Sequence, residues 1–177
     1  MGLRNNFDTI IVINKVDVKK VVDIVHQILL KRNFIVEDDE YLSCLILNEV
    51  LDDELLEENY DKVRRGLNTQ ESLDLLKNHK GGGSLMYKKK LSENDFNVMV
   101  TFKSLNNIEI EAIIFDANSY FSETKDINNI IIDINNSGLQ VIGITQGLQM
   151  LNDLDQETEI ENILNGKINE KYKYIID

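Results

Sequence analysis

The sequence predicts an α+β domain in which a central, mainly antiparallel sheet carries helices mostly on one face. The first observation is a meander over about 84–116, where the β-rich runs LMYKKKL, FNVMVTFK and IEIEAIIF are separated by the turn-like SEND and LNN. The second is a pair of further strand-like runs near 9–13 and 139–145. The third is the helical spacing of apolar residues between these runs. We expect residues 1–177 to form a single domain, because no linker-like stretch divides them.

The N-terminal part begins with a strand over 9–13 and a helix over 18–32, with Asp17 as the N-cap of that helix. The apolar face of the helix consists of residues at three- and four-residue spacing, namely Val18, Val21, Val22, Val25, Ile28 and Leu29. Residues 33–36 then form a turn or a short strand. The pattern over 38–65 is helical, although 41–47 (YLSCLIL) fits a buried strand equally well.

A further helix starts near 69 and is ended by Gly81. Within the meander, apolar residues alternate with polar ones along FNVMVTFK, which predicts one dry face and one wet face. The rest of the chain predicts a helix over 122–136 stopped by Gly138, the strand over 139–145, and a helix over 157–164 closed by Gly166. The final EKYKYIID alternates polar and apolar residues, as an edge strand does.

A short motif follows the first strand. Asn14-Lys15-Val16-Asp17 resembles the guanine-reading NKxD motif of GTP-binding proteins, in which the Asp binds the N1 and N2 hydrogens of guanine. A phosphate loop should accompany such a motif, but the chain's one Gly-Lys pair, Gly166-Lys167, lacks the required glycine and hydroxyl positions around it. We therefore predict that NKVD is a strand–turn–helix junction and that guanine nucleotides do not bind.

The composition restricts the partners. The net charge of −12 repels nucleic-acid backbones and anionic lipid, so we expect neither direct nucleic-acid binding nor membrane binding. The single cysteine, Cys44, fits a reducing compartment, and no apolar run approaches the roughly 20 residues of a membrane span. The absence of proline and tryptophan and the many Ile, Asn and Lys residues are typical of an AT-rich genome. We expect a cytoplasmic bacterial, phage or plasmid protein.

The sequence offers no catalytic residue, metal site or cofactor site. It has no HExxH, CxxC or GxSxG motif. We expect His26 to pack at the edge of the core, His79 to lie at a helix end, and Cys44 to be buried and inert. The acidic series over 153–161 has the rhythm of a calcium loop, but Thr158 replaces the turn glycine and Leu164 the bidentate Glu.

The most unusual segment is 37–61, which carries eleven carboxylates and no Lys or Arg. It is either a solvated helix face or a docking surface for a basic protein. On the second interpretation the chain is a non-catalytic acidic protein-binding module of the immunity or inhibitor type. The residues that we expect to bind the partner are Asp52, Asp53, Glu54, Glu57 and Glu58.

The alternative is a small-ligand-binding protein or an enzyme. Its site would lie near the end of the 108–116 strand, where Asp116, Asn118 and Tyr120 follow one another at alternate positions. The same residue types also favour turns, so the pattern alone does not separate the two interpretations. The sequence predicts no particular oligomeric state.

Overall fold

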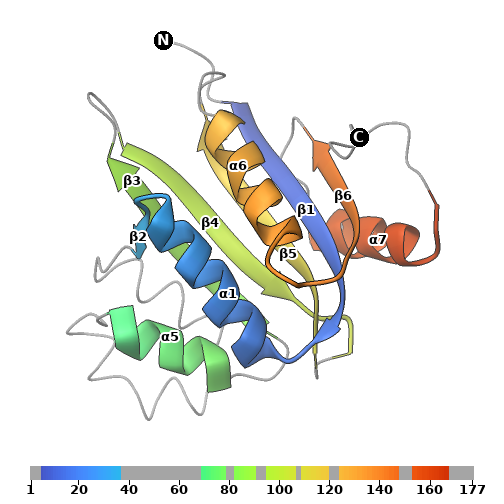
Figure 1. Cartoon of the computed structure of the whole chain (residues 1–177). Helices are drawn as coiled ribbons and strands as arrows, with labels where there is room; N and C mark the ends of the chain where they lie inside the picture. The colour runs from blue at the N-terminus through green and yellow to red at the C-terminus, as the bar shows by residue number, and fades with distance from the viewer. Residues whose placement is uncertain are drawn as a thin grey trace.

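The computed structural model describes residues 5–36, 69–78, 82–90, 95–106, 109–119, 124–147 and 153–167. These residues form one six-stranded sheet with the strand order β2-β3-β4-β5-β1-β6, in which every neighbouring pair is antiparallel. The strands are β1 (Asn5–Val16), β2 (Ile35–Val36), β3 (Gly82–Lys90), β4 (Asp95–Lys103), β5 (Ile110–Ser119) and β6 (Val141–Gly147). The helices are α1 (Val18–Lys31), α5 (Thr69–Asn78), α6 (Thr124–Asn135) and α7 (Asp153–Leu164) (Figure 1). The predicted α+β class with a mainly antiparallel sheet is confirmed.

The meander forms as its alternating pattern predicts. Val100 on β4 lies opposite Leu85 on β3 and Phe115 on β5, and all three side chains are fully buried. The polar positions between the apolar ones point to the other side of the sheet, since successive side chains of a strand alternate between faces. One face of the meander therefore contributes to the main hydrophobic core.

Strand β1 lies between β5 and β6, and it is buried on both faces. Ile11 and Ile13 belong to the main core, whereas Ile10 and Val12 belong to a second, smaller cluster. Because alternate residues of a strand point to opposite faces, the two clusters lie on opposite sides of the sheet. This double burial explains why residues 10–13 (IIVI) are continuously apolar.

The helices divide between the two faces. Helices α1, α5 and α6 contribute buried residues to the main core, and Figure 1 shows α1 and α6 in front of the sheet. Helix α7 covers the opposite face, where Ile160 and Ile163 join the smaller cluster. The expectation that helices lie mostly on one face is thus confirmed for the described helices.

Helix α1 is defined at both ends by local chemistry. The Asp17 side chain accepts a hydrogen bond from the backbone N–H of Lys19 at 2.8 Å, as an N-cap does. At the other end Asn33 has φ 65°, and Phe34 N–H donates to Leu29 O at 3.0 Å. This left-handed residue reverses the chain, so that the buried Phe34 closes the helix against the core.

The packing of α7 depends on one glycine. A Cβ atom at Gly143 of β6 would lie 2.6 Å from Ile163 Cγ2, closer than real side chains approach. The absence of a side chain at this position lets α7 lie directly on the sheet. At its C-terminus Gly166 has φ 71°, and Lys167 N–H donates to Asn162 O at 2.8 Å. Gly166 therefore closes α7, as predicted.

Several element boundaries differ from the sequence predictions. Strand β5 continues to Ser119 rather than ending at 116, and α7 begins at Asp153 rather than at 157. Residues 33–36 form both of the predicted features, a turn and the two-residue strand β2. The predictions for 41–47 and for EKYKYIID lie outside the described residues.

Candidate functional site

The NKVD motif forms the junction between β1 and α1. Asn14 donates twice to Gln140, from its backbone N–H to the backbone oxygen at 2.8 Å and from Nδ2 to Oε1 at 2.9 Å. Its own Oδ1 accepts a hydrogen bond from the backbone N–H of Lys15 at 3.1 Å. Asp17 caps α1. The polar side chains of Asn14 and Asp17 therefore already have hydrogen-bond partners within the protein. The predicted junction of a strand with a helix is confirmed, but β1 continues through Val16, so Asp17 alone separates the strand from the helix.

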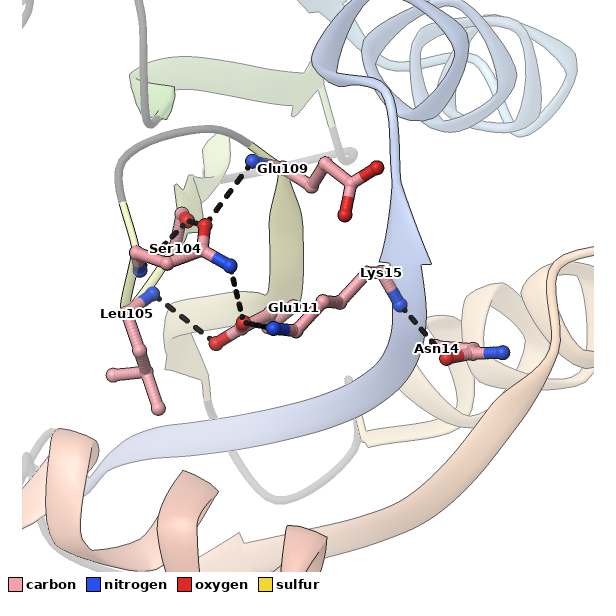
Figure 2. A network of polar contacts seen from close by, with 7 residues as sticks. Asn14, Lys15, Ser104, Leu105, Glu109 and Glu111 are labelled. Atoms are coloured by element: carbon pink, nitrogen blue, oxygen red, sulfur yellow. Dashed lines mark hydrogen bonds and ion pairs between the residues drawn. The ribbon is translucent and has the colours of Figure 1, made fainter.

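A buried carboxylate lies beside this junction, and sequence reasoning missed it. Glu111 is only 2% exposed, and its carboxylate oxygen lies 3.4 Å from the Lys15 ammonium nitrogen. It also accepts hydrogen bonds at 3.2 Å from the backbone N–H of Leu105 and from Asn106 Nδ2. Figure 2 shows these groups converging on Glu111 from β1 and from the connection between β4 and β5.

Asn106 organises the same connection. Its Oδ1 accepts from the backbone N–H of Glu109 at 3.3 Å and from Ser104 Oγ at 2.9 Å, and its own N–H donates to Ser104 Oγ at 3.3 Å. Because the donors to Glu111 come from the protein, the network satisfies a buried charge and fixes the connection between two strands. The Lys15 side chain is 53% exposed, so a ligand approaching from solvent would meet Lys15 before Glu111.

A groove of about 710 Å³ lies between α1 and α6. Arg32, at the end of α1, and Asp133, on the last turn of α6, face each other across it with two hydrogen bonds of 2.8 and 3.0 Å. The hydrogen bonds from Arg32 lower the pKa of the Asp133 carboxyl and raise the pKa of the guanidinium. The groove is lined by Asp23, Ile24, Gln27, Ile28, Lys31, Arg32, Asp133, Asn136 and Ser137. Both charge signs line the groove, with the carboxylates of Asp23 and Asp133 and the cations of Lys31 and Arg32.

His26 was expected at the edge of the core, and the structure places it in a buried position on α1. Its Nδ1 lies 2.8 Å from the Tyr87 hydroxyl, and the His26 side chain is only 8% exposed. Burial lowers the pKa of His26, with a further contribution from the nearby Lys77 cation, and burial raises the pKa of Tyr87. The pair joins α1 to β3 through a buried polar contact.

The alternative site at the end of the 108–116 strand is differently placed. Asp116 and Asn118 lie within β5 and not beyond its end, because the strand continues to Ser119. Asp116 is half-buried, is in register with Met99 and Asp8, and has a pKa raised by burial. Tyr120 lies outside the described residues. Among the residues that the structure describes, no group of three or more His, Cys, Asp or Glu side chains could hold a metal ion.

The residues expected to bind a partner, Asp52, Asp53, Glu54, Glu57 and Glu58, lie outside the described residues, as do Cys44 and His79. The elements on either side of this part of the chain are well anchored. Strand β2 pairs with β3 through Val36 and Tyr87. Helix α5 buries Leu73 and Leu76 in the main core, and its Lys77 forms an ion pair with Asp23 of α1.

No protein-family model, curated protein or solved structure matches the chain. In the described part of the chain, no helix is both long and apolar enough to cross a membrane. The contacts and charges of the described residues are therefore the basis for inferring a function.

Proposed function

We propose that the chain is a non-catalytic, acidic protein-binding module that binds a basic protein partner through residues 37–61. The observation that carries this proposal is the charge of that segment, eleven carboxylates without one Lys or Arg. Such a concentration of one sign produces a field that attracts and orients a cationic surface. It also disfavours nucleic acid and anionic lipid as direct partners. The Asp52, Asp53, Glu54, Glu57 and Glu58 group is the proposed centre of the surface.

The described structure supports this proposal through the elements that flank the segment. Both β2, which precedes it, and α5, which follows it, contact β3. Residues 37–68, which include the acidic segment, are therefore connected at both ends to elements that contact the same strand. A binding segment that is held at both ends loses less conformational freedom on association than a free tail does.

The polar groups around the NKVD motif also favour binding over nucleotide chemistry. Asn14, Lys15 and Asp17 bind Gln140, Glu111 and the first turn of α1, respectively. A guanine base would have to replace these contacts. We propose that the protein is a cytoplasmic protein that neutralises another protein, in the manner of an immunity protein or an inhibitor.

Affinity capture followed by calorimetry tests the proposal. The full chain and a variant with Asp52→Asn, Asp53→Asn, Glu54→Gln, Glu57→Gln and Glu58→Gln serve as parallel baits. A basic protein retained by the first and lost from the second is expected, and the purified pair should bind in calorimetry. Equal retention by both baits would contradict the proposed surface.

The alternative, a small-ligand or enzymatic site around Asp116, has one observation in its favour. Burial raises the pKa of Asp116, and perturbed carboxyl groups are enriched at functional sites. A ligand that stabilises the wild-type chain in a thermal-shift screen but not an Asp116→Asn variant would support it.

A further inference from the structure

The two edges of the sheet are built differently. At one edge lies β2, which has only two residues and pairs with β3 at Lys88 and Tyr87. The next residues of β3 are Lys89 and Lys90. A very short edge strand and a run of lysines both discourage the addition of another strand.

The other edge, β6, has none of these protective residues. Its seven residues, VIGITQG, include no charged residue and no proline. Ile142 is 45% exposed, and within the described residues β6 pairs only with β1. A β-bulge limits strand pairing at one position. Ile142 is an extra residue between the register pairs Ile13–Val141 and Val12–Gly143. Beyond this bulge, residues 143–147 follow β1 without interruption.

Strand β6 is also held rigidly from within the domain. Ile144 belongs to the main core, Thr145 is buried, and Gly143 lies beneath Ile163 of α7. A strand that is already ordered adds a neighbour at a smaller entropic cost than a strand that must first be ordered. Among the described residues, no strand pairs with the N–H and C=O groups of its outer edge, which can therefore accept a further strand.

Charge indicates which partner fits this edge. The stretch from Ile134 to Asn152 contains no charged residue, although the whole chain has a net charge of −12. Two copies of so acidic a chain repel each other over most of their surface, and they can approach most closely where the charge is absent. A basic protein would instead be attracted to the acidic parts of the chain.

We propose that the outer edge of β6 pairs antiparallel with β6 of a second copy of the chain. A two-fold axis between the strands would join the two six-stranded sheets, because identical antiparallel strands are self-complementary. Each Ile142 would then be shielded at the contact. Strand β6 and strand β2, after which the acidic segment begins in the sequence, lie at opposite edges of the described sheet.

Sedimentation equilibrium over a wide concentration range tests the proposal with the full chain. The wild type should approach twice its monomer mass of 20.4 kDa as the concentration rises. Ile142→Lys and Ile142→Glu should each raise the dimer dissociation constant by about tenfold or more, because either charge on an edge opposes strand pairing. Ile35→Lys is the matched control, since Ile35 is 54% exposed on the opposite edge strand and should leave the dimer intact.

Hydrogen exchange provides a second measurement that does not depend on a variant. Amides of residues 141–147 should become more protected as the wild-type chain is concentrated, while those of α1 should not change. A chain that stays monomeric at all concentrations contradicts the proposal, and so does a dimer that both Ile142 variants leave unchanged. Outward-facing amides of 141–147 that are already protected at concentrations where the chain is monomeric would contradict the proposal and assign the edge to a segment of the same chain instead.

Discussion

The Lys15 ammonium lies 3.4 Å from the Glu111 carboxylate and thereby joins the end of β1 to the start of β5. The two ends of this contact differ in environment, because the Lys15 side chain is 53% exposed whereas that of Glu111 is 3% exposed. Removing the buried carboxylate leaves the N–H donors of Leu105 and Asn106 without their acceptor, whereas removing the exposed ammonium leaves Glu111 with both of these donors. Loss of the Glu111 carboxylate should therefore cost more stability than loss of the Lys15 ammonium.

Replacing each partner separately should reveal this asymmetry. Glu111→Gln directs an amide group toward the N–H donors of Leu105 and Asn106, and it should lower the free energy of unfolding by about 1–3 kcal/mol. Lys15→Met should cost less than about 1 kcal/mol, because Glu111 keeps its other donors. Urea denaturation measures both values. Equal losses in the two variants would contradict this account of the network.

The role of Asp17 as a helix cap gives a second prediction. Asp17→Ala should lower the free energy of unfolding by about 1 kcal/mol, because the Lys19 N–H loses its acceptor. In parallel, GTP or GDP with Mg²⁺ should not shift the melting temperature of the wild-type chain. A nucleotide-dependent shift that disappears in the Asp17→Ala variant would instead support the GTPase resemblance.

The burial of His26 predicts a pH dependence of stability. Burial and Lys77 lower its pKa in the folded chain below the ordinary value of about 6.5, while Asp23 acts in the opposite direction. As the pH falls below that value, the unfolded chain takes up the proton first, so the folded state loses stability until the folded pKa is passed. Above about pH 6.5, where the side chain is neutral in both states, the contribution is complete.

A comparison with His26→Gln isolates this effect from the carboxylates that both chains share. The difference in the free energy of unfolding between wild type and variant should decrease from pH 7.5 to pH 5 by chemical denaturation. A difference that stays constant across this range would mean that the His26 pKa is the same in the folded and unfolded chains.

The contact between Gly143 and Ile163 predicts a coupled pair of substitutions. Gly143→Ala introduces a methyl group 2.6 Å from Ile163 Cγ2 and should destabilise the chain by about 1–3 kcal/mol. In an Ile163→Ala background the same change should cost at least about 1 kcal/mol less, because the clashing atom is gone. Additive costs in this double-mutant cycle would show that α7 does not lie against β6.

Much of the fold could be predicted because its periodicity is local. The alternation along β4 and the valine face of α1 each report which side is buried, and the caps at Asp17 and Gly166 mark helix ends. The side of the sheet on which α7 packs could not be predicted in this way. That choice depends on Gly143 offering space to Ile163, which lies twenty positions further along the chain.

The polar network was harder to predict than the fold. Glu111 lies within IEIEAIIF, the sequence run with the strongest strand pattern. In such a run a charged residue is expected on the solvent-exposed face of the sheet. Its burial depends on Lys15, 96 residues earlier, and on the loop that holds Asn106. The sequence signal that could have indicated its burial was a carboxylate within a strand whose other residues are apolar on both faces. The Tyr87 partner of His26 likewise depends on sheet register, since 61 residues separate the two.

The central claim, that residues 37–61 bind a basic protein, is tested most directly by association rates. The rate constant for the captured partner is measured by surface plasmon resonance across a salt series. Neutralising Asp52, Asp53, Glu54, Glu57 and Glu58 should slow association by roughly tenfold or more at low salt. The difference should shrink as salt shortens the reach of the field to about 8 Å at physiological ionic strength.

The matched control removes the same number of negative charges, five, from other parts of the chain. Its substitutions fall on exposed residues of the described structure, namely Asp23→Asn, Asp74→Asn, Asp155→Asn, Glu157→Gln and Glu161→Gln. Because the net charge changes equally in both variants, this control should keep a nearly wild-type association rate if the field of 37–61 guides binding. An association rate that the neutralised 37–61 variant leaves unchanged, or that both variants slow equally, would contradict the claim.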